Sequence, residues 1–383
     1  MKSLDQSAIR RQNVRSILDL LTLQSPRTRQ SLAEATGLSL MTVTNLIDQL
    51  KEQEVLELVP VARSGAGKPA SGRKAENISL SGARHAWLIV DLSGSHFRYT
   101  LLGFDLSVLH EKSFSAEGEY LPCLERFLCG VREEIAAPLD GRILLGVAVV
   151  TPGPYEIASD TVYNQRLPEL NNVRIKALMQ RCLGDYDYYV DEDVKFAVRA
   201  FSPLIEQEPC ELLYYLFIGE GVGGAAVHSG NMLRGLNATA GDAGQLTTPG
   251  GVTYESLLSL SSFAAALGCP AGDIRQLTES LRRCAEENPQ AYLCALDNAA
   301  DAACDMLYSV LWVLDPSHII VDCRYVFPFG EDFARMIRDK LSARLAASGR
   351  RFPAISPSPQ GMSSVIRGAV QVLQREWIAR ILA

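Results

Sequence analysis

Residues 216–245 read LFIGEGVGGAAVHSGNMLRGLNATAGDAGQ, and the rest of the chain is interpreted outward from them. The apolar residues 216–218 run into residues 219–224, four of which are glycine, and the apolar residues 225–227 follow. Glycines at this density between two strands let the backbone approach a ligand closely, and phosphate is the usual ligand. A glycine-rich hairpin without a ligand explains the same residues, so other parts of the chain must decide between the two.

Length and composition describe an ordinary globular protein. The chain has 383 residues, 47% hydrophobic and 21% charged, enough for two or three domains. Residues 1–15 are polar and give no signal pattern, and charges interrupt every apolar run before it reaches a membrane span. We therefore expect a cytoplasmic protein with no membrane partner. Nine scattered cysteines without a C-x-x-C pair favour reduced thiols over disulfides or a zinc site.

Charge is unevenly distributed along the chain. Residues 1–80 hold 11 lysines and arginines against 8 acidic residues, whereas the remaining residues carry a surplus of ten acids. A mildly basic head on an acidic body indicates that only the head meets a polyanion.

The head has the spacing of a helix-turn-helix. Apolar residues recur at i, i+3, i+4 and i+7 in residues 14–21 and again in residues 43–50, which predicts two amphipathic helices. Between them a short helix opens near residues 28–31 and stops at Gly37, and Ser39 is placed to cap the third helix. Strands expected at residues 54–59 and 78–80 flank a cationic, glycine-rich segment and complete a winged helix-turn-helix domain at residues 1–80.

The third helix and the wing supply the predicted DNA contacts. Outward side chains of the helix are short and polar or apolar, so they suit base edges and thymine methyl groups. Because the helix faces the bases without an Arg or Lys, cations elsewhere in the head must attract the phosphates, Arg10, Arg11, Arg27 and Arg29 among them. The residues expected to contact DNA are Ser39, Thr42, Thr44, Asn45, Gln49, Arg63, Lys68, Arg73 and Lys74. The alternative for the head is a small helical module that docks on protein.

Here the sequence resembles a known family. The segments SLAEATGLSLMTVTNLIDQLKEQEVLE (31–57) and SGRKAENISL (71–80) look like the DNA-binding head of ROK-family repressors. The family comprises repressors, open reading frames and sugar kinases. In its repressors a wing containing Gly-Arg precedes an apolar strand, as Gly72-Arg73 does here.

The body, residues 81–383, alternates strands and helices in two successive halves. We expect strands at residues 87–90, 97–103, 106–114, 143–150 and 188–190, and in the second half at 212–218, 225–227 and 318–322. Helices are expected at 120–136, 254–267, 272–287 and 289–314, with two more near the end of the chain. This order predicts an α/β protein with a ligand cleft between two lobes.

The body resembles the sugar-kinase part of the ROK family, which implies a two-lobed actin-like ATPase fold with lobes at about 81–205 and 206–383. The resemblance rests on the TPGP turn at 151–154, the glycine loop at 219–224, AGDAG at 240–244, and residues 363–369.

The resemblance also implies an effector site made from the remains of a sugar site. Asp193 matches the family's catalytic base, but the surrounding Asn-Asp-x-Asn run reads Glu-Asp-Val-Lys, so we expect no catalysis. Local pairing of an acidic strand end explains Asp193 as well, and a loop-capping role explains Asn164 as well as sugar contact. Gln245 stands where the family has a zinc-binding His, and the cysteine-rich loop before Glu255 is missing, so no metal is expected. The expected effector contacts are Asn164, Glu192, Asp193, Asp242, Gln245 and Glu255.

The nucleotide side departs further from the family. Ser93 replaces a glycine of the first phosphate loop, Glu220 replaces a threonine of the second, and residues 321–324 lack the glycines of the adenosine turn. Two unit charges about 4 Å apart at an effective dielectric of about 20 repel by about 4 kcal/mol, so Glu220 disfavours ATP. We expect no cofactor.

The sequence therefore predicts a DNA-binding transcriptional regulator, a repressor by family habit, that acts as a homodimer or higher homo-oligomer. Its partners are a double-stranded DNA operator and a sugar or sugar-derived effector. One alternative is a bifunctional ATP-dependent sugar kinase with a DNA-binding head, and another is a body that serves only for dimerisation.

Overall fold

The structure is a computed structural model that describes residues 6–60, 76–92, 96–115, 118–164, 167–201, 212–323, 330–359 and 363–382. It divides into two units. Unit 1 is formed by Met1–Gly153, Ile157–Asp191 and Val370–Ala383, and unit 2 by Pro154–Glu156 and Glu192–Ala369. The further division into a head at 1–80 and a body at 81–383 stays a prediction.

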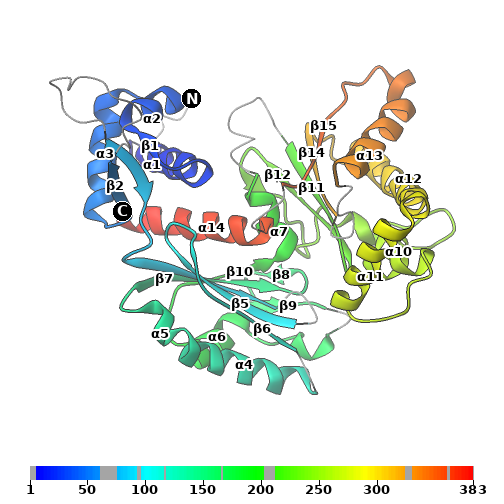
Figure 1. The fold of residues 1–383 in the computed structure, drawn as a ribbon, viewed down its shortest axis with the longest axis horizontal. Coiled ribbons are helices and arrows are strands. Elements are labelled where there is room, and N and C mark those ends of the chain that lie inside the picture. Colours follow the sequence, from blue (N-terminus) through cyan, green and yellow to red (C-terminus); the bar gives the residue numbers. More distant parts are fainter. Residues whose placement is uncertain are drawn as a thin grey trace. The chain divides into compact units, whose positions relative to one another are not determined.

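Unit 1 begins with the expected helices and strands of the head. These are α1 (Gln6–Leu23), β1 (Arg27–Thr28), α2 (Arg29–Thr36), α3 (Leu40–Glu52), β2 (Leu56–Pro60) and β3 (Glu76–Leu80), drawn in blue in Figure 1. The three strands pair antiparallel in the order β1-β3-β2. The apolar positions predicted from spacing are buried, since Ile17, Val43 and Ile47 are each 0% exposed.

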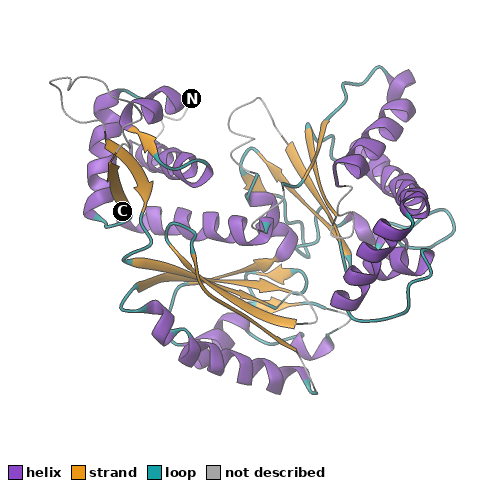
Figure 2. Ribbon diagram, viewed as in Figure 1, coloured by secondary structure: helices purple, strands orange, loops and turns teal. Residues whose placement is uncertain are grey.

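The rest of unit 1 is a five-stranded mixed sheet with helices on its faces (Figures 1 and 2). Its strand order is β10-β7-β4-β5-β6, with β4 parallel to β7 and antiparallel to β5. The strands are β4 (His85–Asp91), β5 (His96–Gly103), β6 (Val108–Ser115), β7 (Ile143–Thr151) and β10 (Tyr188–Glu192). The helices are α4 (Tyr120–Glu134), α5 (Ala136–Leu139), α6 (Ile175–Leu183) and the end of α14 (Ser364–Ile381). Short elements of unit 1 are β9 (Thr161–Val162) and the 3-10 turn η1 (Pro168–Leu170), whereas the short strand β8 (Tyr155–Glu156) belongs to unit 2.

Unit 2 is built on a second five-stranded sheet of order β13-β12-β11-β14-β15. Its strands are β11 (Leu212–Ile218), β12 (Val222–His228), β13 (Asn231–Met232), β14 (His318–Cys323) and β15 (Ala354–Pro357). The helices are α7 (Asp193–Arg199), α9 (Tyr254–Leu258), α10 (Leu260–Ala266), α11 (Ile274–Glu287), α12 (Pro289–Val313) and α13 (Gly330–Leu345). Single 3-10 turns are η2 (Ala243–Gln245) and η3 (Ala346–Ser348).

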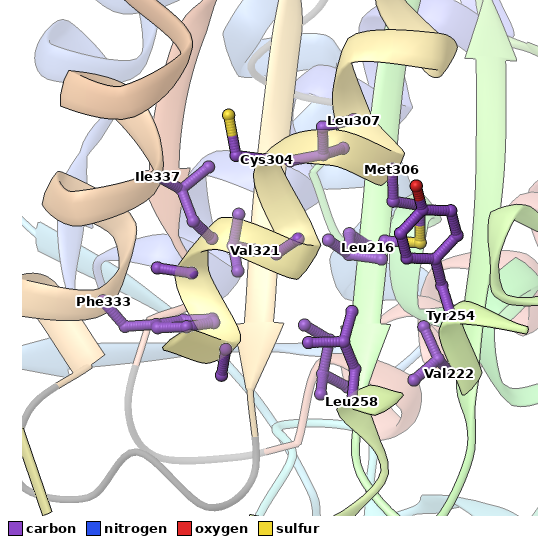
Figure 3. Packing of buried hydrophobic residues seen from close by; sticks show 14 of the residues in the cluster. Leu216, Val222, Tyr254, Leu258, Cys304, Met306, Leu307, Val321, Phe333 and Ile337 are labelled. Atoms are coloured by element: carbon purple, nitrogen blue, oxygen red, sulfur yellow. The ribbon is translucent and has the colours of Figure 1, made fainter. Parts of the chain in front are cut away.

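Alternation along β11 divides the core of unit 2 between two faces. Tyr214 and Leu216 face the helices α9 to α13, whereas Leu213 and Tyr215 face α7. Figure 3 shows Leu216 with Val321 of β14 under α12 in the larger of these clusters. Because both faces are covered, β11 reads as a continuous apolar run rather than an alternating one.

Several expectations about individual elements need correction. The strand expected at 225–227 begins at Val222, so Gly223 and Gly224 lie within a ladder opposite Phe217 and Leu216. The sequence reading missed α6, although its buried residues Ile175, Leu178, Met179 and Cys182 recur at i, i+3, i+4 and i+7, and it missed β15, which is four residues long. β15 is stabilised by pairing with β14, which is distant in sequence, so local spacing does not reveal it. Among the described residues, no helix is long and apolar enough to cross a membrane.

Candidate functional site

The α2–turn–α3 segment of the head is formed by local capping. Gly37 ends α2 with a φ of 70°, a left-handed conformation that glycine adopts without the penalty a Cβ brings. The Oγ of Ser39 accepts a hydrogen bond from the Thr42 backbone N–H at 3.1 Å and thereby caps α3. The two hydroxyls of Ser39 and Thr42 are also 2.8 Å apart. The predicted N-cap is therefore confirmed, and it fixes where the third helix begins.

The outward face of α3 is apolar at its start and polar further on. Met41 is 75% exposed and Leu40 is 49% exposed, although both are large hydrophobic residues. Asn45 is exposed one turn later, and it has no hydrogen-bond partner among the residues described. Thr44 is half-buried and its hydroxyl donates to the Leu40 carbonyl at 2.8 Å. This face would meet the bases if α3 entered a major groove.

Other polar side chains around α3 are engaged inside the head. Arg10 of α1 donates to the Oε1 of Gln49 at 2.7 Å, so the Gln49 amide group is oriented by the protein. Arg29 lies between two carboxylates, 3.4 Å from Asp48 and 3.3 Å from Glu76. Because Arg29 already pairs with these two carboxylates, it is less available to bind a DNA phosphate than the sequence suggested.

The cations of the wing lie outside the described residues. This holds for Arg63, Lys68, Arg73 and Lys74, and likewise for Ser93 of the first glycine turn. Their roles stay predictions.

A group of carboxylates in unit 2 forms the second candidate site. We call Glu192, Asp242 and Glu255, together with Lys195, the Asp242 cluster. Asp242 ends a tight loop that packs on β12: a Cβ at Gly244 would lie 2.0 Å from the Val222 carbonyl oxygen, so only glycine fits. The Tyr214 hydroxyl donates a hydrogen bond to the Gly241 carbonyl at 2.8 Å, which fixes the loop to β11.

One carboxylate oxygen of Asp242 is a buried acceptor without a donor among the described residues. Its Oδ1 atom is fully buried and has no hydrogen-bond partner among the described residues. Burial and repulsion from Glu255 raise the pKa of Asp242 to about 6, against the opposing effects of Lys195 and the Gly244 N–H. An unmet buried acceptor of this kind is satisfied when a ligand brings a hydroxyl or ammonium group.

Lys195 is the buried cation of the cluster. Its side chain is 0% exposed, it forms an ion pair with Glu192, and it donates to the Ala238 carbonyl at 2.5 Å. Ala238 itself has a φ of 57°, unusual for a residue with a Cβ, so Lys195 holds a strained point of the loop that carries Asp242. The ion-pair partner of Lys195 is thus Glu192, the residue beside Asp193.

The other expected effector residues of unit 2 are less buried. Glu255, at the start of α9, accepts a hydrogen bond from the Val222 N–H at 3.3 Å. Asp193 is half-buried at the start of α7, where its Oδ1 accepts from the adjacent Val194 N–H at 2.7 Å. Gln245 is exposed at the end of η2. The charges of Glu255 and Lys195 act on Asp242, and Gln245 lies three residues further along, at the end of the turn that Asp242 begins.

Asn164 belongs to unit 1, and both the nitrogen and the oxygen of its side-chain amide form hydrogen bonds. Its Nδ2 donates to the Pro152 carbonyl at 2.6 Å, and its Oδ1 accepts from the Leu167 N–H at 3.1 Å. These bonds stabilise the surrounding loop, which agrees with the loop-capping role that the sequence offered as an alternative to sugar contact. Contact with an effector stays a prediction.

The glycine-rich turn that directed the sequence interpretation is a tight hairpin. The Gly219 N–H donates to the Gly221 carbonyl at 2.8 Å, and Glu220 between them is half-buried. The Gly219 carbonyl accepts from the Leu260 N–H at 2.6 Å, which fixes the turn against α10. The backbone groups at 219 therefore bind the protein's own chain.

Two features of the site were not foreseen. The contacts of Arg10 with Gln49 and of Tyr214 with Gly241 join residues 39 and 27 positions apart, and no local pattern signals them. By contrast, Glu192 and Lys195, which form an ion pair, are only three positions apart.

Comparison with known proteins places the body in a family. Residues 88–376 match the sequence profile of the ROK family. Among curated proteins the chain is 26% identical over 223 residues to the xylose repressor of Caldicellulosiruptor bescii. That match covers 57% of this chain and 54% of the relative, so the chain spans about half the length of the curated relative it matches.

Solved structures share the fold. A ROK family transcriptional regulator, described as a homologue of the E. coli MLC protein, has a TM-score of 0.66 at 15% identity and matches over 98% of both chains. The ROK hexokinase from Thermus thermophilus has a TM-score of 0.57 at 19% identity, and 97% of it matches 75% of this chain. The expected fold class, a two-lobed actin-like body with an N-terminal helical head, is confirmed.

Proposed function

The chain belongs to the ROK family, and on this premise we propose that it is a DNA-binding transcriptional repressor controlled by a sugar or sugar-derived effector. Its head would bind a double-stranded operator, its body would bind the effector, and two copies would act together in the cytoplasm. Effector binding would change the spacing of the two heads and hence their affinity for the operator.

One observation carries the effector part of the proposal. The buried Oδ1 of Asp242 lacks a donor among the described residues, and Glu255 adds a second carboxylate within electrostatic reach. Carboxylates accept hydrogen bonds and sugars present rows of hydroxyl donors, so a polyol satisfies the cluster. The xylose repressor among the relatives supports a sugar over other polyols.

The DNA part rests on the head. The capped α3 exposes Leu40, Met41 and Asn45 to one side, as a recognition helix must. The MLC homologue, a transcriptional regulator, matches this chain over its head as well as its body, whereas the hexokinase matches about three quarters of it.

A sugar kinase with a DNA-binding head is the second candidate, because Asp193 stands at the position of the family's base. Against it, Glu220 occupies the turn that would face the phosphates, and the Gly219 backbone is bonded within the protein. A coupled assay with ATP and a panel of hexoses decides between the two. Turnover that disappears in Asp193→Asn would establish the kinase and refute our preference.

Thermal unfolding with a panel of sugars and sugar derivatives tests the effector. A ligand at 100 times its Kd stabilises the protein by about 2.7 kcal/mol. We expect this shift for at least one sugar in the wild type, its loss in Asp242→Asn, and its retention in Asp339→Asn, which changes an exposed carboxylate of α13. A flat response to every sugar would favour a body that only dimerises.

Selection from random duplex DNA tests the head. We expect an enriched, roughly palindromic site whose binding weakens in Arg73→Ala, together with a shallower dependence on salt, because a phosphate contact is lost. Asn45→Ala should instead change which sequences are preferred. Equal losses on all sequences in Asn45→Ala would contradict its base-reading role.

A further inference from the structure

The first turn of α3 exposes two large apolar side chains that the fold does not require. Met41 is 75% exposed and Leu40 is 49% exposed, while the buried side of the same helix is filled by Val43, Leu46 and Ile47. The head's core is therefore complete without them. Because these two apolar side chains lie outside the buried face of α3, their exposure indicates a contact with a molecule outside the head.

The polar groups of the same turn are already used within the helix. The Ser39 and Thr42 hydroxyls bond each other and the cap N–H, and the Thr44 hydroxyl donates to the Leu40 carbonyl. The outward surface of this turn is therefore mostly apolar. Asn45, one turn along, is the outward polar group without a partner among the described residues.

In a major groove the apolar group available to such a surface is the C5-methyl of thymine. We propose that Met41 and Leu40 read thymine methyl groups in the operator, so that base recognition at the start of α3 is apolar rather than hydrogen-bonded. This inference rests on the proposed DNA-binding function. The long, unbranched Met41 side chain can adapt to the position of a methyl group.

A protein partner fits the same pair less well. Specific protein interfaces bury about 800 Å² on each side, far more than two side chains provide. Next to the pair, the capped N-terminus of α3 presents backbone N–H groups and the positive end of the helix dipole, which favour an anionic backbone such as that of DNA.

The test replaces thymine by deoxyuridine, which removes the methyl group and leaves every hydrogen-bonding atom in place. An operator is first selected from random duplexes with the full-length protein, and each thymine is then replaced in turn while Kd is measured. We expect one or two positions at which the substitution weakens binding about fourfold, equivalent to the roughly 0.8 kcal/mol of a buried methyl group. At these positions Met41→Ala or Leu40→Ala should remove the difference between thymine and deoxyuridine.

Two control variants separate this reading from its alternatives. Ile9→Ala removes another apolar side chain, 45% exposed on α1, and should leave the thymine preference unchanged. Asn45→Ala should alter preference at other positions while the methyl effect persists. Circular dichroism establishes that all four variants are folded, as expected for exposed side chains.

Several results would overturn the inference. One is a selected operator at which no deoxyuridine substitution weakens binding, or at which the effect survives in both Met41→Ala and Leu40→Ala. Another is a change of oligomeric state in Met41→Ala with DNA binding unaltered, because that would assign the pair to a protein contact. In these cases the proposed DNA-binding function still holds. Failure to select any duplex would refute both.

Discussion

Replacing Glu192 by Gln should destabilise the protein far more than the change of one atom suggests. The Lys195 side chain is 0% exposed and that of Glu192 is 11% exposed, so the ammonium group left behind would be buried without its ion-pair partner, although the Asp242 carboxylate still acts on it electrostatically. The Ala238 carbonyl, at 2.5 Å, would remain as its hydrogen-bond acceptor. Breaking one partner of a buried pair costs about 3–5 kcal/mol.

The double variant Glu192→Gln/Lys195→Met should be more stable than either single variant. Lys195→Met alone leaves a buried carboxylate and is expected to cost a similar 3–5 kcal/mol. In the double variant both charges of the Glu192–Lys195 pair are removed together, and the cost at this pair is the unpaired Ala238 carbonyl, about 1–3 kcal/mol. We therefore expect a coupling energy of at least about 3 kcal/mol between the two positions.

Urea unfolding followed by circular dichroism measures these free energies, and hydrogen exchange of residues 233–245 reports the loop locally. Both Lys195→Met variants should exchange faster there, since Lys195 no longer holds Ala238. A Glu192→Gln variant within about 1 kcal/mol of wild type, or single effects that simply add in the double variant, would refute the reasoning.

Three further outcomes follow from the structure. The pKa of Asp242 is about 6 in the folded state and 3.8 ordinarily, so between these values the folded protein binds one proton that the unfolded chain does not. The free energy of unfolding should therefore fall as pH rises from about 4 to 6. Urea unfolding at a series of pH values should show that Asp242→Asn removes up to about 3 kcal/mol of this loss. Gly244→Ala places a Cβ against the Val222 carbonyl and should lower the thermal midpoint sharply, whereas Gly130→Ala, in an open helical position, should raise stability by about 0.5–1 kcal/mol. Ser39→Ala removes the cap of α3 and should cost about 1 kcal/mol by urea unfolding, with a loss of DNA affinity; an unchanged midpoint would mean that the cap does not stabilise the head.

The head could be predicted closely because its signals are local. Apolar spacing located α3, Gly37 located the end of α2, and Ser39 located the start of α3, all within a few residues of their positions in the structure. The spacing at residues 14–21 also lies within α1, but it did not show that this helix begins at Gln6. Each signal depends on neighbours in sequence: a left-handed C-cap, a side-chain cap, one buried face.

The site could be predicted only in part. Through the family resemblance, the sequence named Asp242 and Glu255 as parts of one expected effector site. It could not show that the Asp242 Oδ1 lacks a donor, or that Arg10 already holds Gln49. Both depend on residues brought together by folding from distant parts of the chain.

The sequence by itself determined that the chain has a capped helical head and a glycine-rich junction between two strands of an α/β body. Only the tertiary structure decided what the glycines are for. A glycine can leave room for a ligand phosphate or for the protein's own backbone. The sequence does not distinguish the two cases, because both depend only on the missing Cβ. At Gly244 the space of the missing Cβ is taken by the Val222 carbonyl, and at Gly219 the backbone N–H and carbonyl form hydrogen bonds with Gly221 and Leu260, so both positions serve contacts within the protein.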